Sequence, residues 1–239
     1  MYDYSYLVGA LFWTGAWIAA WVFLPRQRRA MLWTGLLLAP AGPISAYWSL
    51  QDYWNPPYAL QLTLGSWRIG LEDGLLSFAL TGICAAALER VAGVLGMRPV
   101  RPGWRAAARA LGWLSLGLAI LLACIYALRM PSMNAILLMA AATATLMLAR
   151  TPSLLALAAG MAAVFAAVYW LFYVAFILPL YPGAFAAVWK LDALWGVALA
   201  GVPLEEILWA GVTMLVAGPL LRACSGQATK LNAGNAVAP

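Results

Sequence analysis

The sequence predicts an all-α, polytopic membrane protein with about seven transmembrane helices. The chain is 65% hydrophobic and only 9% charged, and its mean hydropathy is +0.86. Several apolar runs approach the length of about 20 residues that a helix needs to cross the hydrocarbon layer of a membrane. Basic residues concentrate in alternate loops between these runs, as expected for spans that cross in opposite directions. Together these observations exclude a soluble globular fold.

The first apolar run, residues 6–24, predicts a retained helix rather than a cleaved leader. It has no basic segment before it and is longer than the apolar region of a signal peptide. Six more spans are predicted downstream, at about residues 30–48, 70–89, 107–128, 132–149, 153–178 and 203–221. An odd number of spans places the two termini on opposite sides of the membrane.

The charged residues predict the orientation. Of the 14 basic residues, eleven follow the first, third, fifth or seventh span, and only Arg68, Arg129 and Lys190 lie on the other side. By the positive-inside rule we expect an outer N-terminus and a cytoplasmic C-terminus, with the chain in the inner (cytoplasmic) membrane of a bacterium. The net charge of +6 therefore indicates membrane lipids as partners and no nucleic acid. Seven of the 8 acidic residues belong to the outer half, a bias that topology does not explain.

Four of these acids belong to an internal repeat. "GLEDGLLSFAL" aligns with "PLEEILWAGVT" at an offset of 133, which superposes Glu72 on Glu205 and Asp73 on Glu206. An arginine follows Glu72 by 18 residues and Glu205 by 17, so both pairs are expected at similar depth near the outer boundary. The spans predict two parallel three-helix repeats joined by a linker helix. The expected domains are residues 1–95 (first repeat), 96–130 (linker and connecting helix), 131–224 (second repeat) and 225–239 (disordered C-terminal tail).

Glu205, Glu206, Glu72 and Asp73 are the candidate catalytic residues. A charged side chain at the centre of a membrane costs about 2.5–3.5 kcal/mol, so two such pairs require a reason. The first turn of a helix favours negative charge, whereas burial and a neighbouring carboxylate oppose it. We expect at least one member of each pair to keep its proton, which gives a general acid beside a base. The alternative is that these acids serve only as partners of the helix dipole.

Six further residues are candidates for binding a substrate, because they lie near the acids in the sequence or enrich a span in aromatic rings. They are Trp209, Phe78, Asp52, Trp54, Tyr169 and Tyr173. An aromatic face stabilises a nearby cation by about 0.5–2 kcal/mol, although core packing explains the same residues equally well. Most of the outer aromatic residues are expected to form an interfacial belt, among them Trp48, Tyr53, Tyr58, Trp67, Tyr181, Trp189 and Trp195.

Missing residue types exclude several chemistries. The chain has no histidine, which removes Ser-His-Asp catalysis, the HExxH zinc motif and haem ligation by histidine. The intramembrane prenyl-protein proteases need an arginine where Ala210 stands, and a retinal protein needs a lysine within the last span, which Lys190 precedes. No nucleotide motif is present, and the three cysteines lack the spacing of a metal site or a disulfide framework.

The acidic motifs resemble a known family. "GVPLEE" at the last span, with the diverged "GLED" in the third, is similar to the membrane-integral lycopene cyclase domain of bacteria, archaea and fungi, which occurs as two small subunits or one fused chain. The resemblance implies an isomerase without net redox change. Acidic residues, here matched by Glu205, Glu206, Glu72 and Asp73, protonate the terminal double bond of a linear carotene such as lycopene, and the carbocation closes a β-ionone ring. The implied partners are a lipophilic polyene, membrane lipids, and a second copy or other carotenoid-pathway enzymes.

The chain departs from the family pattern near both motifs. Gly70 stands where the first motif normally has proline, and Asp73 replaces glutamate. The family usually has two aromatic residues soon after the Glu pair, whereas this chain reads "EEILWAG" and "EDGLLSF". These departures leave a shorter polyprenoid, or a carotenoid already modified at one end, open as the substrate. No cofactor is predicted, and assistance by a reduced flavin stays open.

Two other functions are compatible with the same pattern. Parallel three-helix repeats also describe small carriers, in which acids couple transport to protons, so a transporter or lipid-binding protein is the first alternative. Against it, the acids lie near one face rather than the midplane, and polar residues for a hydrophilic substrate are scarce. A purely structural membrane subunit is the second alternative.

Overall fold

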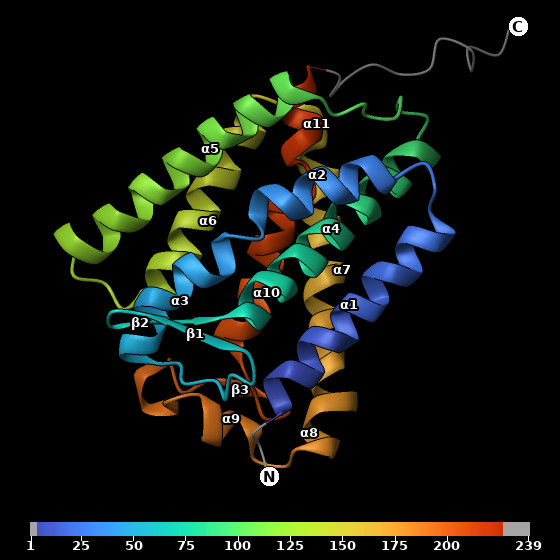
Figure 1. Ribbon diagram of the computed structural model, residues 1–239. Helices are drawn as coiled ribbons and strands as arrows, with labels where there is room; N and C mark the ends of the chain where they lie inside the picture. Colours follow the sequence, from blue (N-terminus) through green and yellow to red (C-terminus); the bar gives the residue numbers. More distant parts are fainter. Residues whose placement is uncertain (1–3, 227–239) are drawn as a thin grey trace, which may run out of the picture.

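The computed structural model describes residues 4–226 and shows an all-α polytopic membrane protein with two short β-hairpins (Figure 1). Within this range six helices are long and apolar enough to cross a membrane. They are Ser5–Phe23, Leu71–Val94, Trp104–Ala127, Ser132–Ala149, Pro152–Leu180 and Leu204–Ser225. The predicted fold class is confirmed, whereas the count of seven spans is not.

The remaining predicted span, residues 30–48, is divided into α2 (Arg28–Leu38) and α3 (Ala41–Asp52). Pro40 and Pro43 cause the division, because a proline has no N–H to donate to the carbonyl one turn earlier. The Leu38 carbonyl instead accepts a hydrogen bond of 2.7 Å from the Ser77 hydroxyl of α4. A side chain of the neighbouring helix thus satisfies a backbone group at the division, as the membrane interior requires.

The first half of the chain forms α1, α2 and α3, a β-hairpin and α4. The bounds not yet given are α1 (Ser5–Phe23), β1 (Gln61–Leu64), β2 (Trp67–Gly70) and α4 (Leu71–Val94). The hairpin is antiparallel and pairs Gln61 with Gly70 and Leu64 with Trp67. Its second strand ends at the residue before α4, so the hairpin holds the first turn of α4 in place.

The second half repeats this order with different short elements. It contains α6 (Ser132–Ala149), a 3-10 turn (Pro152–Leu154), α7 (Leu155–Phe172), a π-helical turn (Tyr173–Ile177), α8 (Leu178–Leu180), α9 (Ala184–Val188), a 3-10 turn (Leu191–Ala193), β3 (Ala198–Leu199), β4 (Val202–Pro203), α10 (Leu204–Ala217) and α11 (Leu220–Ser225). Between the halves, α5 (Trp104–Leu122) continues into a second π-helical turn (Ala123–Ala127). In Figure 1, α5 lies along one edge of the bundle and reverses the direction of the chain.

The two halves correspond at two marked positions. A hairpin ends at Gly70 directly before α4 and at Pro203 directly before α10, which is again an offset of 133. The middle helix of each half is also interrupted at equivalent positions, at Pro40 in the first half and at Tyr173 in the second. These correspondences favour the predicted domains, which stay a prediction: residues 1–95, 96–130 and 131–224. The predicted disordered tail, 225–239, lies outside the described residues except for its first two.

Contacts between the halves are reciprocal, as a pseudo-two-fold axis requires. Helix α1 packs against α7, where Trp13 meets Phe172 at 5.3 Å between ring centroids, and α3 in turn packs against α6. Helices α4 and α10 contact one another at the centre and run in the same direction (Figure 1). We name the end of the bundle with the first turns of α4 and α10 the acid end, and the opposite end, where both finish, the arginine end.

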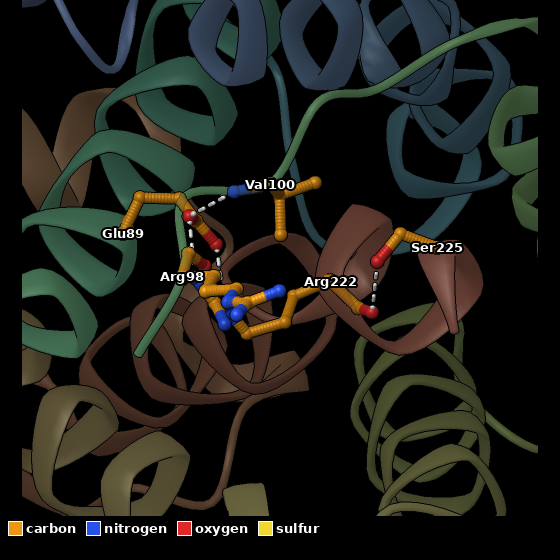
Figure 2. A network of polar contacts seen from close by, with 5 residues as sticks. All are labelled: Glu89, Arg98, Val100, Arg222 and Ser225. Atoms are coloured by element: carbon orange, nitrogen blue, oxygen red, sulfur yellow. Dashed lines mark hydrogen bonds and ion pairs between the residues drawn. The ribbon is translucent and has the colours of Figure 1, made fainter. Parts of the chain in front are cut away.

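A buried ion pair joins the halves at the arginine end (Figure 2). Glu89 of α4 and Arg222 of α11 are 133 residues apart, so equivalent positions meet across the axis. Arg222 Nε and Nη2 each donate to the carboxylate at 2.7 Å, and Nη2 also donates to the Arg98 carbonyl at 3.0 Å. The Val100 N–H also donates to Glu89 Oε2, the oxygen that accepts from Arg222 Nη2, at 3.3 Å. This network fixes the 98–100 segment against both halves.

Small residues allow the central helices to approach one another. The buried surface of α4 includes Ala79, Ala85 and Ala86, and that of α10 includes Ala210 and Ala217. In a membrane, helices associate through close packing and hydrogen bonds rather than through the hydrophobic effect, so small side chains strengthen the contact.

Removal of one member of the buried ion pair should destabilise the fold strongly. Glu89→Gln leaves the Arg222 guanidinium buried without its counter-charge, and we expect the free energy of unfolding to fall by about 3–5 kcal/mol. Chemical unfolding in detergent micelles measures this change. Arg101→Gln, at an exposed position, should change it by less than about 0.5 kcal/mol. Equal stability of Glu89→Gln and the parent would contradict a structural role for the pair.

Gly42 permits the close approach of the divided helix to the acid end of α4. A Cβ at this position would lie 2.3 Å from the Asp73 carbonyl oxygen, which is a backbone atom and cannot move aside. Gly42→Ala should therefore lower the free energy of unfolding by about 1–3 kcal/mol. Gly15→Ala is the matched control, because a Cβ there meets nothing within 4 Å and should be neutral or stabilising. A Gly42→Ala protein as stable as Gly15→Ala would show that this contact is wrongly placed.

Candidate functional site

The four predicted carboxyl groups are all buried at the acid end. The exposed fractions are 1% for Glu72, 2% for Asp73, 0% for Glu205 and 7% for Glu206. Within residues 4–226, Glu89 is the one carboxylate paired with an arginine, so none of the four has a cationic partner. The side chains are therefore directed neither to lipid nor to open water, and hydrogen-bond donors must hold them.

The first acid of each pair is held by backbone N–H groups of the preceding loop. Glu72 Oε1 accepts bonds from Ala59 at 2.7 Å and Leu60 at 2.8 Å, and Glu205 Oε1 accepts one from Trp195. The Oε2 atoms of Glu72 and Glu205 are buried without a partner in the described structure. The two halves thus have the same arrangement. One carboxyl oxygen accepts hydrogen bonds from the preceding loop, and the other has no hydrogen-bond partner in the described structure.

Asp73, the second acid of the first pair, is held by two tyrosines. The Tyr6 hydroxyl of α1 donates to Oδ1 at 2.6 Å, and the Tyr58 hydroxyl donates to Oδ2 at 2.7 Å. Burial, and then the Asp73 carboxylate, raise the pKa of Tyr58, so its hydroxyl stays protonated and remains a donor. Arg68 stacks on the Tyr58 ring at 5.7 Å rather than pairing with Asp73.

Gly70 allows Tyr58 to reach Asp73. The Tyr58 ring lies so close to the backbone that a Cβ on Gly70 would come within 2.0 Å of it. Proline, which the related motif normally has at this position, would meet the same ring. The departure at Gly70 therefore has a physical reason, namely the space required by the tyrosine that binds Asp73.

Glu206, the second acid of the second pair, is held by an indole. Trp189 Nε1 donates to Glu206 Oε1 at 2.8 Å, and the Trp189 ring packs on Phe185 at 4.6 Å between ring centroids. Burial, and then Glu206, raise the pKa of the Tyr53 hydroxyl, and Asp73 acts on it in the same direction. One acid of each pair, Glu206 and Asp73, therefore raises the pKa of the Tyr53 hydroxyl.

A cavity between α1 and α7 adjoins both acid pairs. Its lining includes Tyr6, which binds Asp73, and Trp189, which binds Glu206, but none of the four carboxyl groups. The other lining residues are Ser5, Gly9, Ala10, Trp13, Leu76, Tyr169, Phe172, Tyr173, Ile177, Ala184 and Val188. The cavity is small, about 30 Å³, which suffices for one or two water molecules. A larger ligand must displace side chains of its wall.

Six of the thirteen residues in the wall of this cavity are aromatic. Tyr169 and Tyr173 pack edge to face at 5.1 Å, and their hydroxyl oxygens lie 3.3 Å apart. Trp13 stacks on Tyr169 at 5.8 Å. Tyr173 begins the π-helical turn of the second half, and such turns are frequent at functional sites. The arrangement provides several ring faces around a small space whose wall includes donors to Asp73 and Glu206.

The six predicted substrate-binding residues divide into two groups. Tyr169 and Tyr173 line the cavity, whereas Trp54, Phe78, Trp209 and Asp52 do not. Trp54 packs on Tyr6 at 5.3 Å and pairs with Trp189 in an isolated β-bridge. Trp209 contacts the cavity-lining Tyr169, with 5.7 Å between ring centroids. Phe78 packs on Trp17 within the first half, with 5.0 Å between ring centroids.

Asp52 holds the two halves together. Its carboxylate accepts bonds of 2.6 Å from both the N–H and the hydroxyl of Ser132, the first residue of α6. It thereby satisfies a free N–H at the start of that helix. Both Asp52 oxygens already accept hydrogen bonds from α6, and a substrate contact of Asp52 stays a prediction.

Three residues of the site were not among the predicted site residues, namely Tyr6, Tyr58 and Trp189. The sequence assigned Tyr58 and Trp189 to an interfacial belt, but both bind the buried acids. A usable signal was present, since an aromatic donor precedes the second acid of each pair by 15 residues in the first half and 17 in the second. Tyr6 had no such signal, because it is 67 residues from Asp73.

Comparison of the chain with protein-family models, with curated proteins and with solved structures finds no match. The resemblance of the "PLEE" and "LED" motifs to lycopene cyclases therefore stays a prediction. The chemistry of the site itself must support any functional proposal.

Two substitutions at Glu72 separate its structural role from its charge. Glu72→Gln keeps a carbonyl oxygen for the N–H groups of Ala59 and Leu60, so we expect the free energy of unfolding to change by less than about 1 kcal/mol. Glu72→Leu leaves both donors unpaired and should cost about 2–4 kcal/mol. Unfolding in micelles measures both variants. A Gln variant as unstable as the Leu variant would contradict the assigned bonds.

Proposed function

We propose that the chain is a Brønsted-acid isomerase of the bacterial inner membrane that cyclises an end of an apolar polyene such as lycopene. One observation carries this proposal. Four carboxyl groups are buried without a cationic partner within residues 4–226, and two of them, Asp73 and Glu206, accept hydrogen bonds from Tyr6 and Trp189, which line one aromatic cavity. The resemblance of the acidic motifs to lycopene cyclases supports the same reaction.

The hydrogen bonds favour different roles for Asp73 and Glu206. Asp73 accepts two hydroxyl bonds, which stabilise its ionised form. Glu206 accepts only one side-chain bond, from the Trp189 indole, so its ionised form has less support than that of Asp73. Glu206 is accordingly the proposed general acid, and Asp73 is the proposed base.

The proposed reaction conserves atoms and electrons. The Glu206 carboxylic acid adds its proton to the terminal C=C bond of the polyene and leaves a tertiary carbocation. The π electrons of a nearby double bond close a six-membered ring by forming one C–C bond, and the positive charge moves into the ring. Loss of a ring proton to Asp73, directly or through the Tyr6 hydroxyl, restores a double bond. The product is an isomer of the substrate, so no redox cofactor is needed.

The aromatic wall serves this reaction in two ways. The faces of Tyr169, Tyr173 and Trp13 stabilise a passing cation by about 0.5–2 kcal/mol each in a dry site. The same rings exclude water, which would otherwise trap the cation as an alcohol. Phe172 and Ile177 fill the cavity and must move when a polyene end enters it.

The positive-inside rule supports an orientation for this enzyme. The arginine end is then cytoplasmic, and the acid end lies near the outer boundary of the membrane. A proton-coupled carrier is the competing function, since parallel halves and the free Oε2 atoms of Glu72 and Glu205 also suit proton exchange. A carrier leaves its ligand chemically unchanged, so product analysis separates the two.

Expression in a lycopene-accumulating bacterial host tests the proposal. Chromatography of the pigments should show loss of lycopene and gain of a cyclic isomer of the same mass. Glu206→Gln should reduce the cyclic product at least about 100-fold, the lower range for loss of a general acid. Asp73→Asn should instead consume lycopene slowly and shift the product towards other double-bond isomers or an alcohol.

Asp192→Asn is the matched control for these variants. Asp192 is an exposed acid of the 3-10 turn at the acid end, so its neutralisation should leave the product yield unchanged. An unchanged amount of lycopene in cells with the folded parent chain would contradict the cyclase proposal. Full activity of both Glu206→Gln and Asp73→Asn would contradict it as well.

A further inference from the structure

A second cavity opens at the arginine end, at the far end of α4 from the acids. Its volume is about 180 Å³, and its wall comes from the turn between α1 and α2, the last turns of α4 and residues 97–100. The polar part of the wall is formed by Arg26, Gln27, Glu89 and Arg90. No step of the proposed reaction uses this cavity.

The cavity has a net positive charge. Arg26 and Arg90 are both exposed, and neither makes an ion pair with a carboxylate in the described part of the chain. The negative end of the α4 dipole partly opposes them, but its charge is only about half a unit. Two full charges beside one another therefore favour an anionic ligand.

The one carboxylate in the wall is already neutralised. Glu89 receives two bonds from Arg222 and one from the Val100 N–H (Figure 2). These bonds turn the Glu89 oxygens towards Arg222, so its charge does not cancel those of Arg26 and Arg90. The same network fixes Val100, which is part of the cavity wall. The buried ion pair thus shapes the cavity and keeps it electropositive.

Apolar side chains complete the cavity. Ala30, Val94, Met97 and Val100 line it beside the arginines, and Val94 is 71% exposed to the surroundings. A ligand that fits such a wall has an anionic group next to an apolar part. Phospholipids carry a phosphodiester next to acyl chains, and basic pockets at the cytoplasmic ends of membrane helices bind such head groups.

We propose that this cavity binds the phosphodiester head group of an anionic phospholipid. Arg26 and Arg90 contact the phosphate oxygens, Gln27 donates to the head group, and Val94 and Met97 contact the start of the acyl chains. The site is independent of the cyclase proposal, because it lies at the opposite end of α4.

Binding of a soluble short-chain lipid to the purified full chain in micelles tests this site. Dihexanoyl phosphatidylglycerol should bind saturably, and dihexanoyl phosphatidylcholine should bind at least about tenfold more weakly. Arg26→Gln combined with Arg90→Gln should weaken phosphatidylglycerol binding by about 10- to 30-fold. Arg105→Gln combined with Arg150→Gln removes the same charge from residues that stack on Trp104 and Trp113, and should change the affinity less than twofold.

Each remaining outcome of this experiment contradicts the proposal. Equal affinity for the two lipids would mean that the head-group charge is not recognised, and an equal loss in both double variants would mean that only overall charge matters. Inorganic phosphate that binds as tightly as phosphatidylglycerol would show a site for free phosphate rather than for a lipid. A folding control by circular dichroism ensures that the variants are compared as folded proteins.

Discussion

Four carboxyl groups lie buried inside this membrane protein, and no cation among residues 4–226 forms an ion pair with any of them. Water is absent from the hydrocarbon region, so each group needs hydrogen-bond donors from the protein itself. The chain supplies backbone N–H groups for Glu72 and Glu205, and aromatic side chains for Asp73 and Glu206. The hairpins, the divided helix and the aromatic cluster at the acid end all serve to bring these donors into position.

The two halves satisfy this constraint with equivalent positions but different donors. Glu72 and Glu205 have the same arrangement, whereas Asp73 receives two tyrosine hydroxyls and Glu206 receives one indole N–H. This asymmetry is the physical basis for assigning different roles to two acids that the repeat makes equivalent. At the arginine end the repeat is also asymmetric, since equivalent positions hold Glu89 and Arg222 and can therefore neutralise one another.

The sequence was a good predictor where a signal is local. Hydropathy predicted six of the spans, and the offset of 133 predicted the equivalence of the acid pairs that the structure places at the same end.

The sequence did not predict the division at Pro40, because a proline within a span is compatible with either a kink or a break. The sequence also missed Tyr6, because its bond to Asp73 connects residues far apart in the chain. Tyr58 and Trp189 were assigned to the lipid interface, because composition does not show where a loop folds back. The bond of Asp52 to α6 was also not predicted, since its partner Ser132 lies 80 residues away.

The central claim is that a carboxyl group at the acid end keeps its proton at neutral pH. Infrared spectroscopy of the purified chain in lipid nanodiscs measures this directly, because a protonated carboxylic acid has a C=O stretching band that an ionised carboxylate lacks. We expect such a band at pH 7, a clear decrease of it in Glu206→Gln and no change in Asp192→Asn. A spectrum without a carboxylic acid band at pH 7, or a band that Glu206→Gln leaves intact, would contradict the assignment of Glu206 as the proton donor.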